Sequence, residues 1–245
     1  MSVSKNVRGA ALVFGGARGI GAAAVKRLAE DGYDVSFTYV SRPDKAQELV
    51  EHIATAGGRA YAIKADSAKI DEIRSAVADA VAQFGQLKAV VVNAGIYRGA
   101  AIEDVTLHDL DEMLNINIRA VFLSIQASIP HLQDGGRVVT IGSNVANHTG
   151  HPGSSVYQLT KTAVAGLVKG VALDLAPRQI TVNNIQPGPV ETDLTADMIE
   201  HLIPRSPLKR VGKPQEIGAL ISYLVSEEAG YMTGASLTID GGYTL

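Results

Sequence analysis

The sequence predicts an α/β fold: a doubly wound sheet of about seven parallel strands with helices on both faces. Three observations predict it. Short apolar, β-branched runs alternate with longer segments of helical spacing, which is typical of βαβ units. The runs are apolar at nearly every position, as expected for strands that are covered on both faces. A glycine-rich turn joins the first run to the first helical segment, where such folds bind a ligand.

Seven runs are expected to form the strands, and they span 10–14, 35–40, 60–64, 88–92, 137–142, 180–185 and 236–240. Helical spacing is found in four long segments, at 19–30, 69–84, 107–127 and 156–175. A further helix is expected near Pro214. The proline-bearing segment 187–214 is the least regular and is expected to form a lid over a pocket. Residues 1–245 are expected to form one domain, because α/β domains reach this length and no linker or repeat interrupts the chain.

Composition excludes several classes of function. The net charge is −3 and no block of Lys or Arg stands out, so we expect no nucleic-acid partner and no anionic membrane surface. There is no cysteine, which excludes disulfides and thiolate metal sites. His148 and His151 are three apart but lie in a Gly/Pro-bearing stretch, and we expect no metal. The N-terminal MSVSKNVRGAALVF lacks the features of a signal peptide, so a cytoplasmic location is expected.

The stretch GGARGIG, residues 15–21, follows the first strand and opens the first helix. Glycines permit a tight turn and close approach of the backbone, and a helix N-terminus presents free N–H groups to phosphate. This segment is therefore expected to bind the pyrophosphate of a dinucleotide. A tight turn that needs glycine for its own geometry is the alternative.

The end of the second strand predicts which dinucleotide is bound. An acid there would bind the ribose of NAD, but Tyr39 occupies that position and VSFTYVSR contains no acid. Arg18 in the glycine turn, with Ser41 and Arg42 after the strand, suits a 2′-phosphate, because a guanidinium can pair with it through two hydrogen bonds. NADP(H) is favoured, and NAD(H) stays open.

Tyr157 and Lys161 open the helix after the fifth strand in the stretch YQLTK. Residues four apart share a helix face, so both side chains can point at one ligand. An ammonium beside a phenol favours the phenolate, and Ser143 at the end of the fifth strand could hold a carbonyl or alkoxide oxygen. With a nicotinamide cofactor, these groups indicate a ketone reductase. The ends of the other strands supply Asn93, Ala94, Gly95, Pro187 and Gly188.

Seven motifs together resemble the short-chain dehydrogenase/reductase family over essentially the whole chain, and the chain is similar to its 3-oxoacyl-carrier-protein reductase-like carbonyl reductases. They are GGARGIG (15–21), NAG (93–95), INIRAVF (116–122), IGS (141–143), YQLTK (157–161), QPGPVET (186–192) and TGASLTIDGG (233–242). The resemblance implies a Rossmann-type NAD(P)-binding fold, a small carbonyl or alcohol substrate and a homotetramer.

The resemblance also implies roles for individual residues. Tyr157 is similar to the catalytic acid–base, and Lys161 to the residue that lowers its pKa and binds the nicotinamide ribose. Ser143 resembles the partner of the substrate oxygen, and Asn117 a fourth member that holds a water for proton relay. Asp66, Asn93 and Thr192 resemble contacts of adenine, adenosine and carboxamide, although Asp66 could form a turn and Thr192 a cap. The expected cofactor contacts are Gly15, Ala17, Arg18, Gly19, Ile20, Tyr39, Ser41, Arg42, Asp66, Ser67, Asn93, Ala94, Gly95, Tyr157, Lys161, Pro187, Gly188, Val190 and Thr192.

The chain departs from the family at three places, of which Thr160, in place of the usual serine before the lysine, is a mild change. Phe14 stands where the family usually has a threonine hydroxyl before the first glycine, and the loop 144–156 carries an extra residue beside the substrate. Arg98 or a histidine is expected to meet any anionic group of the substrate. The remaining residues expected around the substrate are Ile96, Tyr97, Val145, His148, His151 and the lid residues 193–208.

Two more specific functions stay open. Reduction of 3-oxoacyl thioesters is a common activity of similar enzymes. A biofilm-dispersal member of the family, described as binding a cyclic dinucleotide, is also similar to this chain in several motifs and suggests a regulatory protein.

Overall fold

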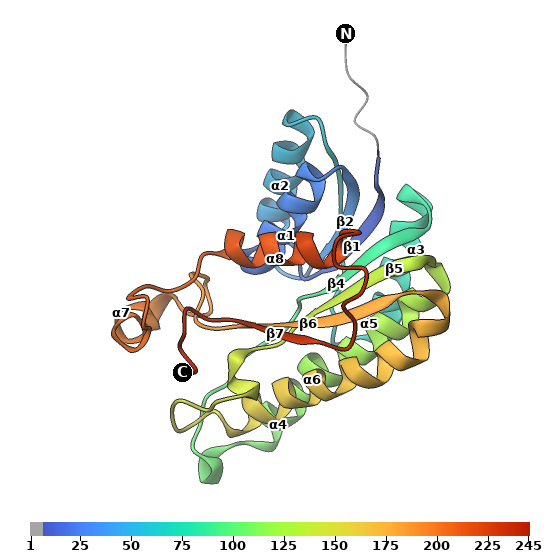
Figure 1. The fold of residues 1–245 in the computed structure, drawn as a ribbon. Helices are drawn as coiled ribbons and strands as arrows, with labels where there is room; N and C mark the ends of the chain where they lie inside the picture. The colour runs from blue at the N-terminus through green and yellow to red at the C-terminus, as the bar shows by residue number, and fades with distance from the viewer. Residues whose placement is uncertain (1–6) are drawn as a thin grey trace.

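The computed structural model describes residues 7–245 and contains one sheet of seven parallel strands (Figure 1). The strands are β1 (Gly9–Phe14), β2 (Tyr33–Tyr39), β3 (Arg59–Lys64), β4 (Leu87–Val92), β5 (Leu132–Ile141), β6 (Thr181–Pro187) and β7 (Ser236–Ile239). Their order is β3-β2-β1-β4-β5-β6-β7, the doubly wound, Rossmann-type arrangement that the sequence predicts. The order reverses between β1 and β4, and in such sheets this is the place where ligands bind. The predicted fold class is confirmed.

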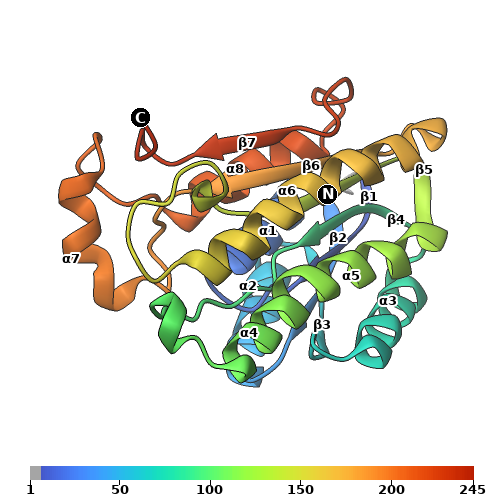
Figure 2. The same cartoon turned by 90° about the horizontal axis from the view of Figure 1, so that it is seen from below.

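Helices cover both faces of this sheet, as the views from the side and from below show (Figures 1 and 2). One face carries α1 (Gly19–Glu30), α2 (Pro43–Thr55) and α8 (Pro214–Val225). The other carries α3 (Ile70–Phe84), α5 (Ala120–Ser128) and α6 (Ser155–Leu175). The short α4 (Leu107–Leu114) precedes α5, and α7 (Ile199–Leu202) lies in the segment between β6 and α8.

The apolar strand runs fill two separate cores. Along β1, Leu12 and Phe14 point into the core beneath α3, α5 and α6, whereas Ala11 and Val13 point into the core beneath α1, α2 and α8. Successive side chains of a strand face opposite sides of the sheet, so a strand with helices on both sides must be apolar at every position. This accounts for the continuous apolar runs in the sequence.

Three element predictions need correction. The helix expected at 107–127 is α4 and α5 separated by the π-helical turn Asn115–Arg119. A π-turn adds a residue to the helical repeat and often marks a functional site; here it contains Asn117, which is fully buried. The helix α2 is missing from the sequence prediction, and β5 begins at Leu132, five residues before the expected start.

The expected lid at 187–214 is largely irregular, with the short α7 and two 3₁₀ turns, Ala196–Met198 and Ile203–Arg205. It lies at the same end of the sheet as the C-terminus (Figures 1 and 2). Within residues 7–245, no helix combines the length and the apolar character needed to cross a membrane. The part of the N-terminal prediction that falls on residues 1–6 lies outside the described residues.

Candidate active site

A cavity of about 790 Å³ opens at the carboxyl ends of the central strands, between the glycine turn and the lid. All the catalytic and cofactor-binding residues predicted from the sequence line it, with the exception of Asn117. The cavity therefore joins residues from several strand ends and from the lid that are far apart in the chain.

The glycine turn is held by side chains from two neighbouring strands. Gly15 has a left-handed φ of 75°, its N–H donates to Thr38 Oγ1 at 2.9 Å, and its carbonyl accepts from Asn93 Nδ2 at 2.7 Å. Asn93 therefore braces the turn, and it also lines the cavity. Thr38 was not predicted from the sequence, and its hydroxyl replaces the support expected from a residue at position 14.

The turn and the start of α1 have the features of a phosphate cradle. At Gly21 an added Cβ would lie 2.0 Å from the Gly15 carbonyl oxygen, so the backbone approaches itself too closely for a side chain. Arg18, the N-cap of α1, makes no side-chain capping bond, and the first turn has no acid. The first N–H groups of α1 are thus free of competing side-chain acceptors at the cavity wall, which suits a pyrophosphate.

Both arginines predicted to bind a 2′-phosphate line the cavity, and both are paired with carboxylates. Arg42 donates to Asp44 through Nε at 3.0 Å and Nη2 at 2.7 Å. The side-chain hydrogen bonds from Arg42 lower the pKa of Asp44 to about 2. Arg18 pairs with the lid residue Asp193 at 2.9 Å. These pairs are exposed and contribute little to stability, so a phosphate can displace the carboxylates.

Two interpretations of Asp66 were open from the sequence, a contact with adenine and a turn former, and its position is compatible with both. Its carboxylate accepts from the Ala68 N–H at 2.9 Å, which forms a turn after β3, and the residue lines the cavity.

Thr192 is positioned by Thr195, which was not singled out in the sequence. The Thr195 hydroxyl bonds both the N–H (3.2 Å) and the carbonyl (3.1 Å) of Thr192, and donates to the Val190 carbonyl.

Tyr157 and Lys161 project from the first turns of α6, as predicted from their spacing. Lys161 is buried, its Nζ donates to the Ile141 carbonyl at 2.9 Å, and it lies 5.6 Å from the centroid of the Tyr157 ring. Burial lowers the pKa of Lys161 from 10.5 to about 8. Burial also raises the pKa of Tyr157 to about 12, with a hydrogen bond to Ser143 acting in the opposite direction. The lowering of the Tyr157 pKa by Lys161 that the sequence predicts is therefore wrong for this structure, because desolvation of the phenolate decides the direction of the shift.

Ser143 and Asn117 support this pair from two sides. The buried Ser143 hydroxyl accepts from the Val145 N–H at 3.3 Å and so caps the short turn after β5. Asn117 lies behind the cavity wall: its amide accepts from the Ile96 N–H at 2.8 Å and donates to the Ile96 carbonyl and to Thr160 Oγ1. Its side chain braces the wall at Ile96 through these bonds.

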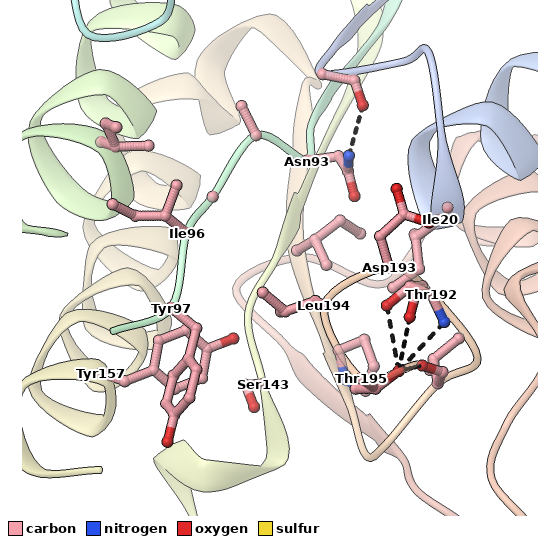
Figure 3. A pocket seen from close by; sticks show the side chains of 18 of the residues that line it. Ile20, Asn93, Ile96, Tyr97, Ser143, Tyr157, Thr192, Asp193, Leu194 and Thr195 are labelled. Atoms are coloured by element: carbon pink, nitrogen blue, oxygen red, sulfur yellow. Dashed lines mark hydrogen bonds between the residues drawn. The ribbon is translucent and has the colours of Figure 1, made fainter. Parts of the chain in front are cut away.

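The part of the cavity beside Tyr157 is mainly apolar. The rings of Tyr97 and Tyr157 meet edge to face, with centroids 5.1 Å apart, on one side of the cavity, and the lid residues from Thr192 to Thr195 lie across from them (Figure 3). Most of the substrate residues predicted from the sequence line this part. Further lining residues, not individually predicted from the sequence, are Leu194, Met198, Leu202 and Tyr243.

Arg98 is an exception to the predicted pocket. It does not line the cavity, and its guanidinium pairs with Glu112 at 3.0 Å and lies 3.9 Å from Asp109. The expectation that Arg98 meets an anionic substrate group is therefore wrong for this structure.

Within residues 7–245, no group of three or more His, Asp or Glu side chains is arranged to hold a metal ion.

The fold and the site define an α/β protein that is built to hold a dinucleotide beside a Tyr–Lys pair. A family model described as enoyl-(acyl carrier protein) reductase matches residues 15–244. A curated relative, the 3-oxoacyl-[acyl-carrier-protein] reductase FabG of Staphylococcus aureus, is 36% identical over 238 residues, covering 95% of this chain and 96% of the relative. The chain belongs to the short-chain dehydrogenase/reductase family of oxidoreductases.

Solved structures agree with this assignment. A short-chain dehydrogenase/reductase from Serratia marcescens superimposes with a TM-score of 0.95 at 46% identity, covering 98% of this chain and all of that one. A short-chain dehydrogenase from Burkholderia cenocepacia, solved in complex with NADP, has a TM-score of 0.95 at 42% identity and covers 99% of this chain and 100% of its own.

Proposed function

We propose that this protein is an NADP(H)-dependent reductase that interconverts a ketone and a secondary alcohol. The observation that carries the proposal is the convergence of Ser143, Tyr157 and Lys161 at the floor of one cavity, next to an apolar wall. A proton donor and a hydroxyl that meet at one point suit a carbonyl oxygen, which becomes negative as hydride reaches its carbon.

The cofactor is NADP(H). The proposal is supported by the free N–H groups at the start of α1, by Arg18 and Arg42 at the cavity wall, and by the NADP bound to the Burkholderia relative. Asp66, Asn93 and Thr192 also line the cavity, and we assign the first two to adenosine and Thr192 to the carboxamide. When bound, the nicotinamide supplies the hydride.

The residues of the chain supply the proton. With its pKa raised to about 12, Tyr157 is protonated at neutral pH and can donate its proton to the substrate oxygen. Ser143 holds the same oxygen by hydrogen bond. Below a pH of about 8, Lys161 is charged and stabilises the tyrosinate that remains. In the reverse direction Tyr157 acts as the base and must first lose its proton.

The wall of the cavity indicates an uncharged substrate. The Lys and Arg residues that line it are Arg18, Arg42 and Lys161, all assigned to the cofactor or to catalysis. The other lining residues include aromatic and aliphatic side chains, together with uncharged polar ones such as Asn144 and Ser154 and the two histidines His148 and His151. We therefore infer a neutral, largely apolar ketone. A 3-oxoacyl thioester, the substrate type in the name of the Staphylococcus relative, is the second candidate, and its long acyl chain would suit the same apolar wall.

The test is loss of nicotinamide absorbance with NADPH and NADH in parallel, against neutral ketones, diketones, 3-oxoacyl thioesters and an enoyl thioester. Tyr157→Phe is expected to abolish turnover while NADPH still binds, and Tyr61→Phe, on the exposed β3, serves as the matched control. Near-normal turnover by Tyr157→Phe would contradict the assigned role.

Tight NADPH binding without turnover of any substrate would instead favour a regulatory protein. Calorimetry with a cyclic dinucleotide, with and without NADPH, then decides that alternative.

We also propose that the chain forms a single domain and assembles as a homotetramer. Exposed apolar side chains on α5 and α6 support assembly, with Phe122 at 46%, Leu159 at 54% and Leu173 at 78% exposure. Light scattering after size-exclusion chromatography measures the mass, and a monomer would contradict the proposal.

A further inference from the structure

Three segments that are distant in the sequence meet at the outer wall of the cavity. They are residues 144–154 of the substrate loop, residues 193–210 of the lid, and the C-terminal tail (240–245). Each contributes residues that line the same cavity as Tyr157: His148 and Gly150 from the loop, Met198 and Leu202 from the lid, and Tyr243 from the tail. Their relative positions determine the space that a substrate can occupy.

One side chain joins all three segments. Arg205, at the end of the 3₁₀ turn that follows α7, donates through Nη2 to the Gly150 carbonyl at 2.5 Å. Its guanidinium also lies over the ring of Tyr243, 5.4 Å from the ring centroid. A guanidinium at this distance is attracted to the face of an aromatic ring. Arg205 therefore links lid to loop by a hydrogen bond and lid to tail by a cation–π contact.

The sequence at Gly150 fits this contact. A Cβ at Gly150 would lie 2.9 Å from Arg205 Nη2 and 3.7 Å from the Tyr243 ring. Gly150 does not have the left-handed φ that favours glycine elsewhere in the chain. A side chain at this position would therefore have to displace the guanidinium of Arg205 from its present place.

The tail is folded so that Tyr243 reaches this contact. The Asp240 carboxylate accepts from the N–H groups of Gly242 (2.9 Å) and Thr244 (3.0 Å), and from the Thr244 hydroxyl (2.8 Å). These bonds close a turn at the end of β7. Asn144 in the substrate loop lies 3.4 Å from the same carboxylate, which adds a second link between loop and tail.

We propose that Arg205 clamps the substrate loop, the lid and the tail together and thereby sets the size of ketone that the site accepts. The inference rests on the proposed reductase function. Arg205 is exposed, and its two contacts are with the pocket-lining residues Gly150 and Tyr243. Neither contact is an ion pair with a carboxylate. The clamp can therefore open for substrate entry and close around a bound substrate. Arg205 is a positioning residue and does not touch the reacting atoms.

The test compares a small aliphatic ketone with a bulky aryl ketone. In Arg205→Ala we expect KM for the small ketone to rise about tenfold with kcat nearly unchanged, because the loose wall no longer encloses it. The ratio of kcat/KM for the bulky ketone to that for the small one should rise by a similar factor. Gly150→Ala, which displaces the guanidinium without removing it, should shift the ratio in the same direction. Glu200→Ala, an exposed change on α7, is the control.

Unchanged ratios in Arg205→Ala and Gly150→Ala would overturn the proposal, as would a parallel loss of NADPH affinity, which would indicate general damage. If the wild type reduces no ketone, the proposed function fails, and hydrogen exchange still tests the clamp. Amides of 147–153 and 199–205 should then exchange faster in Arg205→Ala than in the wild type, and equal exchange would refute the clamp.

Discussion

Replacing Lys161 by methionine should make the protein's stability depend on pH in a different way. Lys161 is 5% exposed, and burial lowers its pKa from 10.5 in the unfolded chain to about 8. Below pH 8 the side chain is charged in both states, so the full penalty of burying an ammonium is present. Between pH 8 and 10.5 the folded protein has released the proton and the unfolded chain has not, so stability rises with pH. Methionine has a similar length and does not titrate.

The magnitude follows from the two pKa values. One pKa unit corresponds to about 1.4 kcal/mol, so the complete change is about 3 kcal/mol. Between pH 7 and about pH 10 most of it, about 2.5 kcal/mol, should appear in the difference between wild type and Lys161→Met. At pH 7 this term favours the methionine variant, although loss of the hydrogen bond to Ile141 reduces its advantage by about 1 kcal/mol.

Urea unfolding of the cofactor-free proteins, at one protein concentration and several pH values, measures this difference. Taking the difference between the two proteins removes the titration of all other groups. A difference that is independent of pH would refute the reasoning, because it would mean that Lys161 titrates alike in the folded and unfolded states.

Three further predictions concern the cofactor site and the reaction. Arg42→Ala should raise KM for NADPH about tenfold and leave KM for NADH nearly unchanged; steady-state kinetics with both cofactors checks it, and equal effects would remove the phosphate-binding role. Gly21→Ala should destabilise the protein by about 3 kcal/mol and abolish NADPH binding, because its Cβ meets the Gly15 carbonyl. Thermal unfolding and cofactor titration test this, with Gly166→Ala, where a Cβ meets open space, as the control. In the direction of reduction, kcat should be constant at neutral pH and fall above about pH 8 as Lys161 loses its charge; a rate that rises there would contradict the assignment.

Several features of the protein are determined by short-range sequence patterns. The strands alternate with helices at regular periods, and the glycine turn between β1 and α1 follows from chemistry within one short stretch. The placement of Tyr157 and Lys161 on one face depends only on the helical repeat. Since the carboxyl ends of parallel strands share one edge, even the meeting of Asn93, Ser143 and Gly188 is predictable from the order of strands and helices along the chain.

Other features depend on contacts between residues that are far apart, and the tertiary structure alone decided them. Desolvation fixes the pKa values of Tyr157 and Lys161, and burial is a property of the surrounding fold. Arg98 is a plausible substrate contact by position, but Glu112 on α4 holds it elsewhere. Tyr243 enters the cavity wall because the tail turns at Asp240.

The roles of Thr38 and Asn117 also depend on contacts between residues that are far apart in the sequence. Thr38 supports the glycine turn from 23 residues away, and Asn117 braces Ile96 because a π-turn directs its side chain inward. The sequence on its own determined the fold class, the dinucleotide turn and the Tyr–Lys pair, since each depends on local repeats and on the geometry of parallel strands. Which side chains close the substrate pocket was decided by tertiary packing, because their partners are set by the path of the chain in space.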